Sequence, residues 1–300
     1  MSSFRLLRLS FVAWLLCHAL AVRADDDNTL TWCQFNLPPV YIVSGPKAGQ
    51  GIMDGYVSFF IKKLPNSYRH RFQLSNLARI QTELREGKPL LCAGLQRNEE
   101  RDTYALYSEP FDIIQSPHLL LPASKLALLK PWLGSNGLLP LDKLPAVLDG
   151  SGLVLGITSG RSYGPALDKQ IATIKDHPRV MTRLTADGVG EGLIRMMQLG
   201  RIDAAITFVT EDMQYRELYQ SGNDPLIGVG IDGLPRFSTI HVLAPKTDWG
   251  RKLIGQLNAI IRSNWNDAEF RFNTFISGHQ GEDRAQVQSM LREIDPNRKR

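Results

Sequence analysis

The order of strand and helix patterns is the strongest constraint on how this chain can fold. Strand, helix, strand, helix and strand patterns follow one another at residues 30–35, 54–64, 71–74, 77–86 and 89–94. The same order recurs at residues 153–158, 164–174, 180–184, 190–199 and 202–208. Strands separated by helices build a mostly parallel sheet with helices on its faces. The sequence therefore predicts an α/β protein with two lobes, each a mostly parallel sheet flanked by helices.

The segments outside the two units predict how the lobes connect. Residues 117–122 contain HLLL and form an extended segment that crosses to the second lobe, and a strand pattern at 237–244 returns to the first. Lobe one is thus expected to comprise residues 25–118 and 240–300, and lobe two residues 119–239. Two crossing strands form a hinge over a cleft, and a cleft of this kind is a common place for a ligand.

The first 24 residues have the pattern of a secretory signal peptide. Arg5 and Arg8 precede a mostly apolar core at 9–20, and Val22 and Ala24 place small residues at the two positions that a signal peptidase recognises. Cleavage is predicted after Ala24, which predicts a periplasmic protein. The alternative is an uncleaved membrane anchor, but a span requires about 20 apolar residues.

The charges that follow the leader are nearly balanced. Removal of Arg5, Arg8 and Arg23 leaves 32 of the 35 basic residues against 30 acidic ones. Such a balance does not predict nucleic-acid binding. The remaining histidines are too scattered for a metal site, and Gly-x-Ser-x-Gly and phosphate-loop motifs are absent from the sequence. No cofactor, metal ion or nucleic-acid partner is therefore expected.

Two cysteines, Cys33 and Cys92, remain after cleavage, and both lie in apolar strand patterns. An even number of cysteines in an oxidising compartment permits one disulfide. Two buried thiols are the alternative, since free cysteine is often a small core residue. Geometry decides between the two, and the sequence does not give it.

The end of the third strand pattern carries Gln96, Asn98 and Arg101. A strand end that presents amide groups and a fixed positive charge is a natural site for an anionic small molecule. A guanidinium offers a bidentate clamp, in which each charged hydrogen bond contributes about 1.5–3 kcal/mol. The alternative for Arg101 is a salt bridge to a neighbouring glutamate.

Three segments resemble family 3 extracellular solute-binding proteins, which have the type II periplasmic binding fold. They are AGLQRNEERDTYALYSEPF at 93–111, TSGRSYGPALDK at 158–169 and GRID at 200–203. The resemblance extends over nearly the whole chain after the leader. It implies that Arg101 grips a ligand carboxylate, that Ser162 offers a hydroxyl, and that Arg161 and Tyr163 add a charge and a ring.

One departure from the family pattern concerns the ammonium group of an amino-acid ligand. Amino-acid-binding members place an aspartate five residues beyond the one that matches Asp203, and here Phe208 stands at that position. Glu211 and Asp212 follow three and four residues later, so a short shift could restore an acid. Taken at face value, the pocket has two arginines and no fixed acid. This favours an anionic or aromatic ligand.

Further candidates come from the first unit. Phe35 and Leu37 follow the first strand, where the family often places an aromatic residue that covers the ligand. Asp54 matches the family's Gly-x-x-Asp step and is expected to cap a helix. Arg79 is a candidate third cationic contact, with a surface role as the alternative.

Together these features predict a monomeric periplasmic binding protein that captures a small polar solute, anionic or amino-acid-like, between its lobes. Its expected partner is an ABC permease of the inner membrane. Two alternatives are a sensor module that acts in trans on a membrane kinase or cyclase, and a dehydratase-like enzyme of the same fold. The enzyme would need a carboxylic acid as proton donor. Glu99, Glu109 and Glu211 are the candidates for that role.

Overall fold

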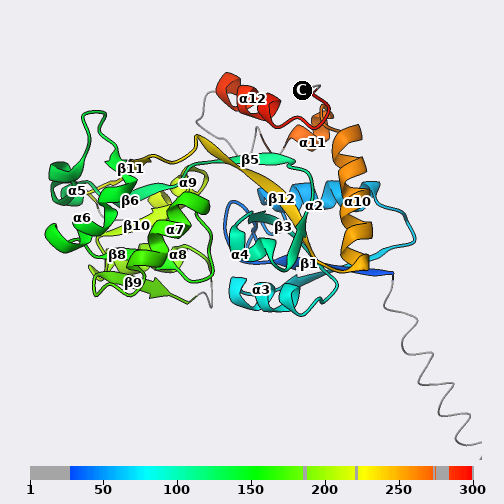
Figure 1. The fold of residues 1–300 in the computed structure, drawn as a ribbon, viewed down its shortest axis with the longest axis horizontal. Coiled ribbons are helices and arrows are strands. Elements are labelled where there is room, and N and C mark those ends of the chain that lie inside the picture. The colour runs from blue at the N-terminus through cyan, green and yellow to red at the C-terminus, as the bar shows by residue number, and fades with distance from the viewer. Residues whose placement is uncertain (1–27, 185–187, 220–221, 273, 275–283, 299–300) are drawn as a thin grey trace, which may run out of the picture.

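The computed structural model describes residues 28–184, 188–219, 222–272, 274 and 284–298. The predicted signal peptide lies outside these ranges. Figure 1 shows two lobes side by side, joined by extended strands. Each lobe is built on a six-stranded sheet of the described residues. No helix in these ranges is long and apolar enough to cross a membrane.

The sheet of lobe one has the order β2-β1-β3-β12-β4, and β5 also pairs with β12. Its strands are β1 (Thr29–Gln34), β2 (Arg69–Leu74), β3 (Leu90–Gln96), β4 (Ala105–Tyr107), β5 (Asp112–Gln115) and β12 (Phe237–Pro245). Its helices are α2 (Ile52–Lys63), α3 (Leu77–Arg85), α4 (Glu99–Asp102), α10 (Asp248–Ser263), α11 (Ala268–Phe272) and α12 (Arg284–Glu293). In its core the Phe60 ring packs against the rings of Phe111 and Phe270.

The sheet of lobe two has the order β7-β11-β6-β10-β8-β9. Its strands are β6 (His118–Pro122), β7 (Leu139–Pro140), β8 (Leu155–Thr158), β9 (Val180–Arg183), β10 (Ala204–Thr207) and β11 (Leu226–Asp232). Its helices are α5 (Leu126–Leu129), α6 (Leu144–Gly150), α7 (Pro165–Ile174), α8 (Glu191–Gln198) and α9 (Val209–Leu218).

Both sheets combine a parallel part with antiparallel strands from the hinge. The predicted β-α-β-α-β units form the parallel parts, β2-β1-β3 and β10-β8-β9. The strands next to the crossings run the other way, since β12 is antiparallel to β3 and β6 is antiparallel to β10. A strand that enters from the opposite lobe runs back along the sheet, and this is why the sheets are mixed rather than mostly parallel.

The chain changes sheets twice, between β5 and β6 and between β11 and β12. The C-terminal helix α12 packs on the first of these crossings. Its Val287, Met290 and Leu291 form a small apolar cluster with Ile113 of β5. Figure 1 shows α12 (red) above β5, on the outer side of the hinge.

Local contacts fix the strand ends that lead toward the cleft. A disulfide joins Cys33 on β1 to Cys92 on β3, with a Cα–Cα distance of 5.1 Å. Asp54 in the first turn of α2 accepts hydrogen bonds from the backbone N–H groups of Gly51 (2.9 Å) and Ile42 (3.1 Å). It therefore satisfies donors at a helix N-terminus and in the preceding loop, in agreement with its predicted capping role.

Two glycines on α10 provide a matched test of its packing. A Cβ at Gly250 would lie 2.0 Å from the backbone oxygen of Pro245, whereas a Cβ at Gly255 would meet no atom within 4 Å. Gly250→Ala is expected to lower the free energy of unfolding by about 1–3 kcal/mol, because a clash with backbone forces the helix off the sheet. Gly255→Ala is expected to raise it by up to about 1 kcal/mol through helix propensity. Urea denaturation of the two variants measures both effects, and equal effects of the two substitutions would contradict this packing.

Candidate functional site

A cavity lies between the two lobes, with an empty volume of about 710 Å³ that includes space open to solvent. Lobe one contributes mainly apolar side chains, among them Phe35, Leu37, Val40, Ile52, Met53 and Leu95. It also contributes Gln96 and Arg101. Lobe two contributes Arg161, Ser162, Val189, Phe208, Thr210 and Glu211. The cavity is thus an apolar chamber with a few polar groups, which is the usual character of a small-molecule site.

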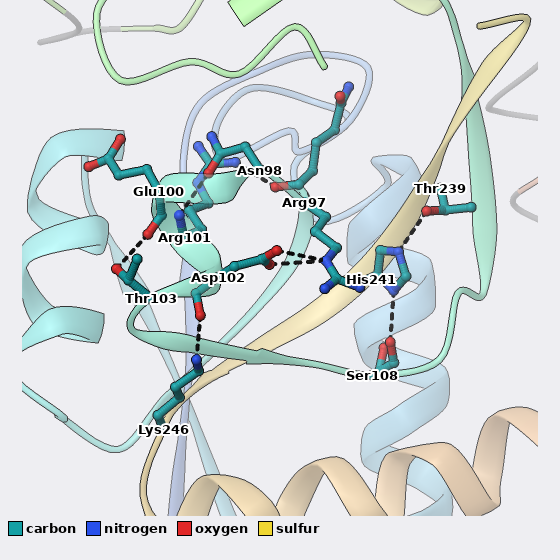
Figure 2. Close-up of polar contacts among 11 residues, drawn as sticks. Arg97, Asn98, Glu100, Arg101, Asp102, Thr103, Ser108, Thr239, His241 and Lys246 are labelled. Atoms are coloured by element: carbon teal, nitrogen blue, oxygen red, sulfur yellow. Dashed lines mark hydrogen bonds and ion pairs between the residues drawn. The ribbon is translucent and has the colours of Figure 1, made fainter. Parts of the chain in front are cut away.

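The short helix α4, at the end of β3, positions Arg101. The Asn98 side chain caps this helix and accepts a hydrogen bond from the Arg101 backbone N–H at 2.8 Å. Arg97 pairs with Asp102 at 3.0 Å, and Lys246 donates to the Asp102 carbonyl. Figure 2 shows these contacts holding the turn from two sides. Arg101 therefore projects from a fixed turn, and Asn98 helps to fix that turn by capping the N-terminus of α4.

The Arg101 guanidinium is buried, with 2% of the residue exposed. Nη1 donates to the Gln96 carbonyl at 2.7 Å and Nη2 to the Gly160 carbonyl at 3.2 Å. Within the described ranges, Nε and the side-chain oxygen of Gln96 have no hydrogen-bond partner. Glu100 pairs with Arg85 rather than with Arg101. The hydrogen bonds of the buried guanidinium go to neutral carbonyls, and the charge of nearby Asp168 compensates it only in part, so an anion in the cavity would compensate it further.

On the lobe-two wall of the cavity, Arg161 forms a buried ion pair with Glu211. Nη1 lies 3.1 Å from Oε2 and Nη2 contacts Oε1, so the pair is bidentate. Tyr215 donates its hydroxyl to Oε2 of Glu211 at 2.8 Å. Burial lowers the pKa of Arg161, but the charge and hydrogen bonds of Glu211 together with the nearby Tyr163 and Tyr215 raise it by more, so the pKa lies above its usual value. Burial, followed by the charge of Glu211, raises the pKa of Tyr215, so its hydroxyl remains a donor.

The expectation that the pocket has no fixed acid is wrong. Glu211 lies in the cavity wall, and so does Asp112 of β5. Helix α9 begins at Val209, and its first turn brings Glu211 back over Phe208, to whose carbonyl the Glu211 N–H donates at 2.9 Å. Asp212 faces away from the cavity, 3.1 Å from Nε2 of His118. The short shift considered from the sequence is therefore what the fold produces.

Most of the predicted site residues lie together in the cavity wall: Phe35, Leu37, Gln96, Arg101, Arg161, Ser162 and Phe208. Three do not. Asn98 caps α4 and lies in an adjoining interlobe pocket. Tyr163 is packed behind Arg161, with the guanidinium carbon 5.4 Å from its ring centre. Arg79 lies on α3 outside the cavity, with its side chain 68% exposed and paired with Glu83.

The two lobes touch across the cleft. The Gly160 carbonyl of lobe two accepts hydrogen bonds from Gln81 Nε2 at 2.6 Å and from Arg101 on lobe one. Gly160 has a φ of +71°, a left-handed conformation that favours glycine, and this turn points its carbonyl at lobe one. The Val189 N–H donates to the Asn36 carbonyl at 2.9 Å. The structure thus represents a closed arrangement of the lobes.

Asp168, in the first turn of α7, provides a pH test of this region. It accepts hydrogen bonds from the Ser162 hydroxyl and from the Tyr163 N–H (2.7 Å). Burial nevertheless raises the pKa of Asp168. The folded protein therefore holds this proton more tightly than the unfolded chain. Protonated Asp168 therefore contributes to the stability of the folded protein. This contribution is fully present below about pH 3.9, the ordinary pKa of aspartate, and is lost as the pH rises through the raised pKa.

Asp168→Asn is expected to remove this pH dependence, because asparagine carries no charge, its oxygen can accept from the Tyr163 N–H, and its amide can donate to the Ser162 hydroxyl. For each unit by which the pKa of Asp168 is raised, the free energy of unfolding is about 1.4 kcal/mol lower at neutral pH than at low pH. The variant should therefore be at least as stable as the wild type at pH 7 and should lose its advantage near pH 4. The test is to measure the free energy of unfolding of both proteins at several pH values. The prediction is contradicted if the variant gains less stability over the wild type at pH 7 than at pH 4.

The carboxylates proposed for a dehydratase-like enzyme are either exposed or already bound by arginine. Glu99 is exposed, and both oxygens of Glu109 lie 2.9 Å from Nε of Arg262. Glu211 is bound to Arg161 and Tyr215. In the described part of the chain, no three His, Cys, Asp or Glu side chains are grouped as they would be to hold a metal ion.

Solved structures of known proteins resemble this fold. Neither protein-family models nor curated proteins match the chain. A structure from work on glutathione import via GshT and the cystine ABC importer TcyBC of Streptococcus mutans has a TM-score of 0.61 and 16% identity, covering 84% of this chain and 95% of that one. An ancestral arginine-binding protein bound to glutamine has a TM-score of 0.59 and 18% identity, covering 82% and 96%.

A histidine-bound ABC uptake transporter substrate-binding protein from Streptococcus pneumoniae gives a similar result. Its TM-score is 0.60 at 16% identity, and the match covers 84% of this chain and 94% of that chain. At these identities the likeness is one of fold. The two-lobed periplasmic binding fold predicted from the sequence is therefore confirmed.

Proposed function

We propose that this protein is a periplasmic solute-binding protein that captures a small carboxylate-bearing solute between its lobes. The observation that carries the proposal is the buried Arg101 guanidinium, whose hydrogen bonds go to the neutral carbonyls of Gln96 and Gly160 while its Nε has no partner among the described residues. A guanidinium matches the two oxygens of a carboxylate in geometry as well as charge. The predicted signal peptide supports a periplasmic location, where the proposed monomer would deliver its solute to an ABC permease.

The apolar part of the cavity suggests what the rest of the solute is like. Phe35, Leu37, Met53 and Leu95 face it from lobe one and Phe208 faces it from lobe two. Burial of apolar groups of the solute against these side chains contributes about 25 cal/mol per Å². We therefore expect a compact solute with one carboxylate and an apolar body.

Closure follows from the division of contacts between the lobes. Arg101 belongs to lobe one, whereas the Gly160–Ser162 turn and Phe208 belong to lobe two. A solute that touches both walls interacts with more groups in the closed form than in the open form, and this difference shifts the equilibrium toward closure. The named neighbours support the proposal, because arginine, glutamine and histidine each carry a carboxylate.

The test compares carboxylates with their amides. Isocaproate, hydrocinnamate and isovalerate, together with leucine, phenylalanine and valine, are compared with the corresponding amides in thermal unfolding and titration calorimetry. A bound carboxylate is expected to stabilise the protein by about 2.7 kcal/mol at a hundredfold excess over its Kd. The amides should give no comparable shift. Equal binding of acids and amides, or binding of none of these carboxylates at millimolar concentration, would refute the proposal.

A further inference from the structure

The ion pair between Arg161 and Glu211 occupies the wall of the proposed solute cavity. Both residues line it, yet the side chains are only 7% and 0% exposed. A buried ion pair usually joins elements within a core. Here it lies on the lobe-two side of the cavity that Arg101 lines from lobe one, in a position where a bound solute would meet it.

Glu211 has little capacity left for a solute. An ionised carboxylate offers about four acceptor positions. Arg161 takes one on each oxygen, and the Tyr215 hydroxyl takes a second position on Oε2. Three positions are thus filled by the protein itself. A cationic group on a solute would have to displace Arg161 before it could use Glu211 fully.

Arg161 is also held from its other faces. Its guanidinium carbon lies 5.0 Å from the Phe208 ring centre and 5.4 Å from that of Tyr163. Cation–π contacts of this kind favour a cation in this position. The Arg161 N–H donates to the Thr158 carbonyl at 3.3 Å, so the backbone turn is fixed as well. Arg161 is therefore a permanent, positioned positive charge.

The second acid in the wall is occupied in a different way. Asp112 on β5 is 2% exposed and accepts a hydrogen bond from Thr274 Oγ1 at 3.1 Å. Thr274 in turn contacts the Tyr56 hydroxyl in the core of lobe one. Asp112 thus belongs to a hydrogen-bond network that reaches into the core of lobe one. The described wall presents two guanidinium groups and has no carboxylate free of protein contacts.

We infer that Arg161 takes the place of a solute cation, so that the cavity selects carboxylates that lack a cationic group over amino acids of the same shape. This inference rests on the proposed function. An ammonium group near Arg161 would meet a like charge, and like charges at close range disfavour each other. The carboxylate that could balance the ammonium group, Glu211, is already bound to Arg161. The expected solute class is therefore compact carboxylic acids with an apolar body and no amine.

The test uses pairs of solutes that differ only by the amino group: isocaproate and leucine, hydrocinnamate and phenylalanine, and isovalerate and valine. Titration calorimetry on the wild-type protein is expected to show at least about tenfold tighter binding of the deaminated acid in the pair that binds best. Equal or tighter binding of the amino acid overturns the inference while leaving the proposed function intact. Binding of no member of the panel overturns both.

Two variants assign the preference to the ion pair. Arg161→Met leaves Glu211 with an unpaired carboxylate, and the preference is expected to reverse in favour of the amino acid by about tenfold. Arg161→Met combined with Glu211→Gln leaves no unpaired charge and is the control that folds even if the single variant does not. In the double variant the amino acid and its deaminated partner should bind within about threefold of each other. A double variant that keeps the wild-type preference contradicts the role of Arg161.

Discussion

Arg101→Met is expected to weaken binding of a carboxylate solute by about 100-fold or more. Two charge-assisted hydrogen bonds contribute about 1.5–3 kcal/mol each, and every 1.4 kcal/mol is a tenfold change in Kd. Methionine is similarly long and apolar, so it fills the site of the side chain without its charge. Titration calorimetry with the best-binding acid measures the loss directly.

Stability separates a binding role of Arg101 from a structural one. Removal of the guanidinium should cost the solute-free protein no more than its hydrogen bonds to the Gln96 and Gly160 carbonyls, about 1–3 kcal/mol in total, so the variant should still fold. Arg79→Met is the matched control, since Arg79 lies outside the cavity with a largely exposed side chain. If a folded Arg101→Met variant bound solute as tightly as the wild type, the assignment of Arg101 would be wrong.

Removal of the disulfide is expected to give the largest loss of stability. Cys33 and Cys92 are 59 residues apart in the chain. Cross-linking a loop of this length lowers the entropy of the unfolded chain by an amount equivalent to about 4 kcal/mol, within an observed range of about 2–5 kcal/mol. The double substitution Cys33→Ala/Cys92→Ala should lower the free energy of unfolding by that amount. Urea denaturation without reductant measures it.

Reduction of the wild-type protein provides the control for this experiment. A thiol reductant should lower the stability of the wild type toward that of the double variant and leave the variant unchanged. The bond joins neighbouring strands of the lobe-one sheet, and β1 leads directly to Phe35 and Leu37 in the cavity wall. A double variant within about 0.5 kcal/mol of oxidised wild type would show that the bond does not constrain the unfolded chain.

The sequence predicts the two-lobed fold because apolar periodicity reports burial. In α2, Tyr56, Val57 and Phe60 share one predicted face, and all three are buried. The same logic misses α9. That helix buries Glu211 and Tyr215, which are polar, so no apolar stripe marks it. The helix that holds the partner of Arg161 is therefore hidden from a search for hydrophobic patterns.

The orientation of individual side chains could not be predicted from the sequence. Arg79 stands at the start of α3, next to strand ends that point to the cleft. Leu77, Ile80 and Leu84 define the buried face of that helix, and Arg79 lies on another face. Asn98 has the right spacing for a ligand contact but is used as a helix cap. Residue type and spacing suggest a site, and helix phase and capping decide which side chains reach it.

A crystal structure of the protein with the tightest-binding acid of the panel would show directly whether Arg101 holds the solute carboxylate. We expect a solute enclosed between the lobes, with its carboxylate oxygens about 2.7–2.9 Å from the Arg101 guanidinium nitrogens. Its apolar body should contact Phe208 and Leu95. A solute bound outside this cavity, or one inside it whose carboxylate does not contact Arg101, would contradict the proposed binding site.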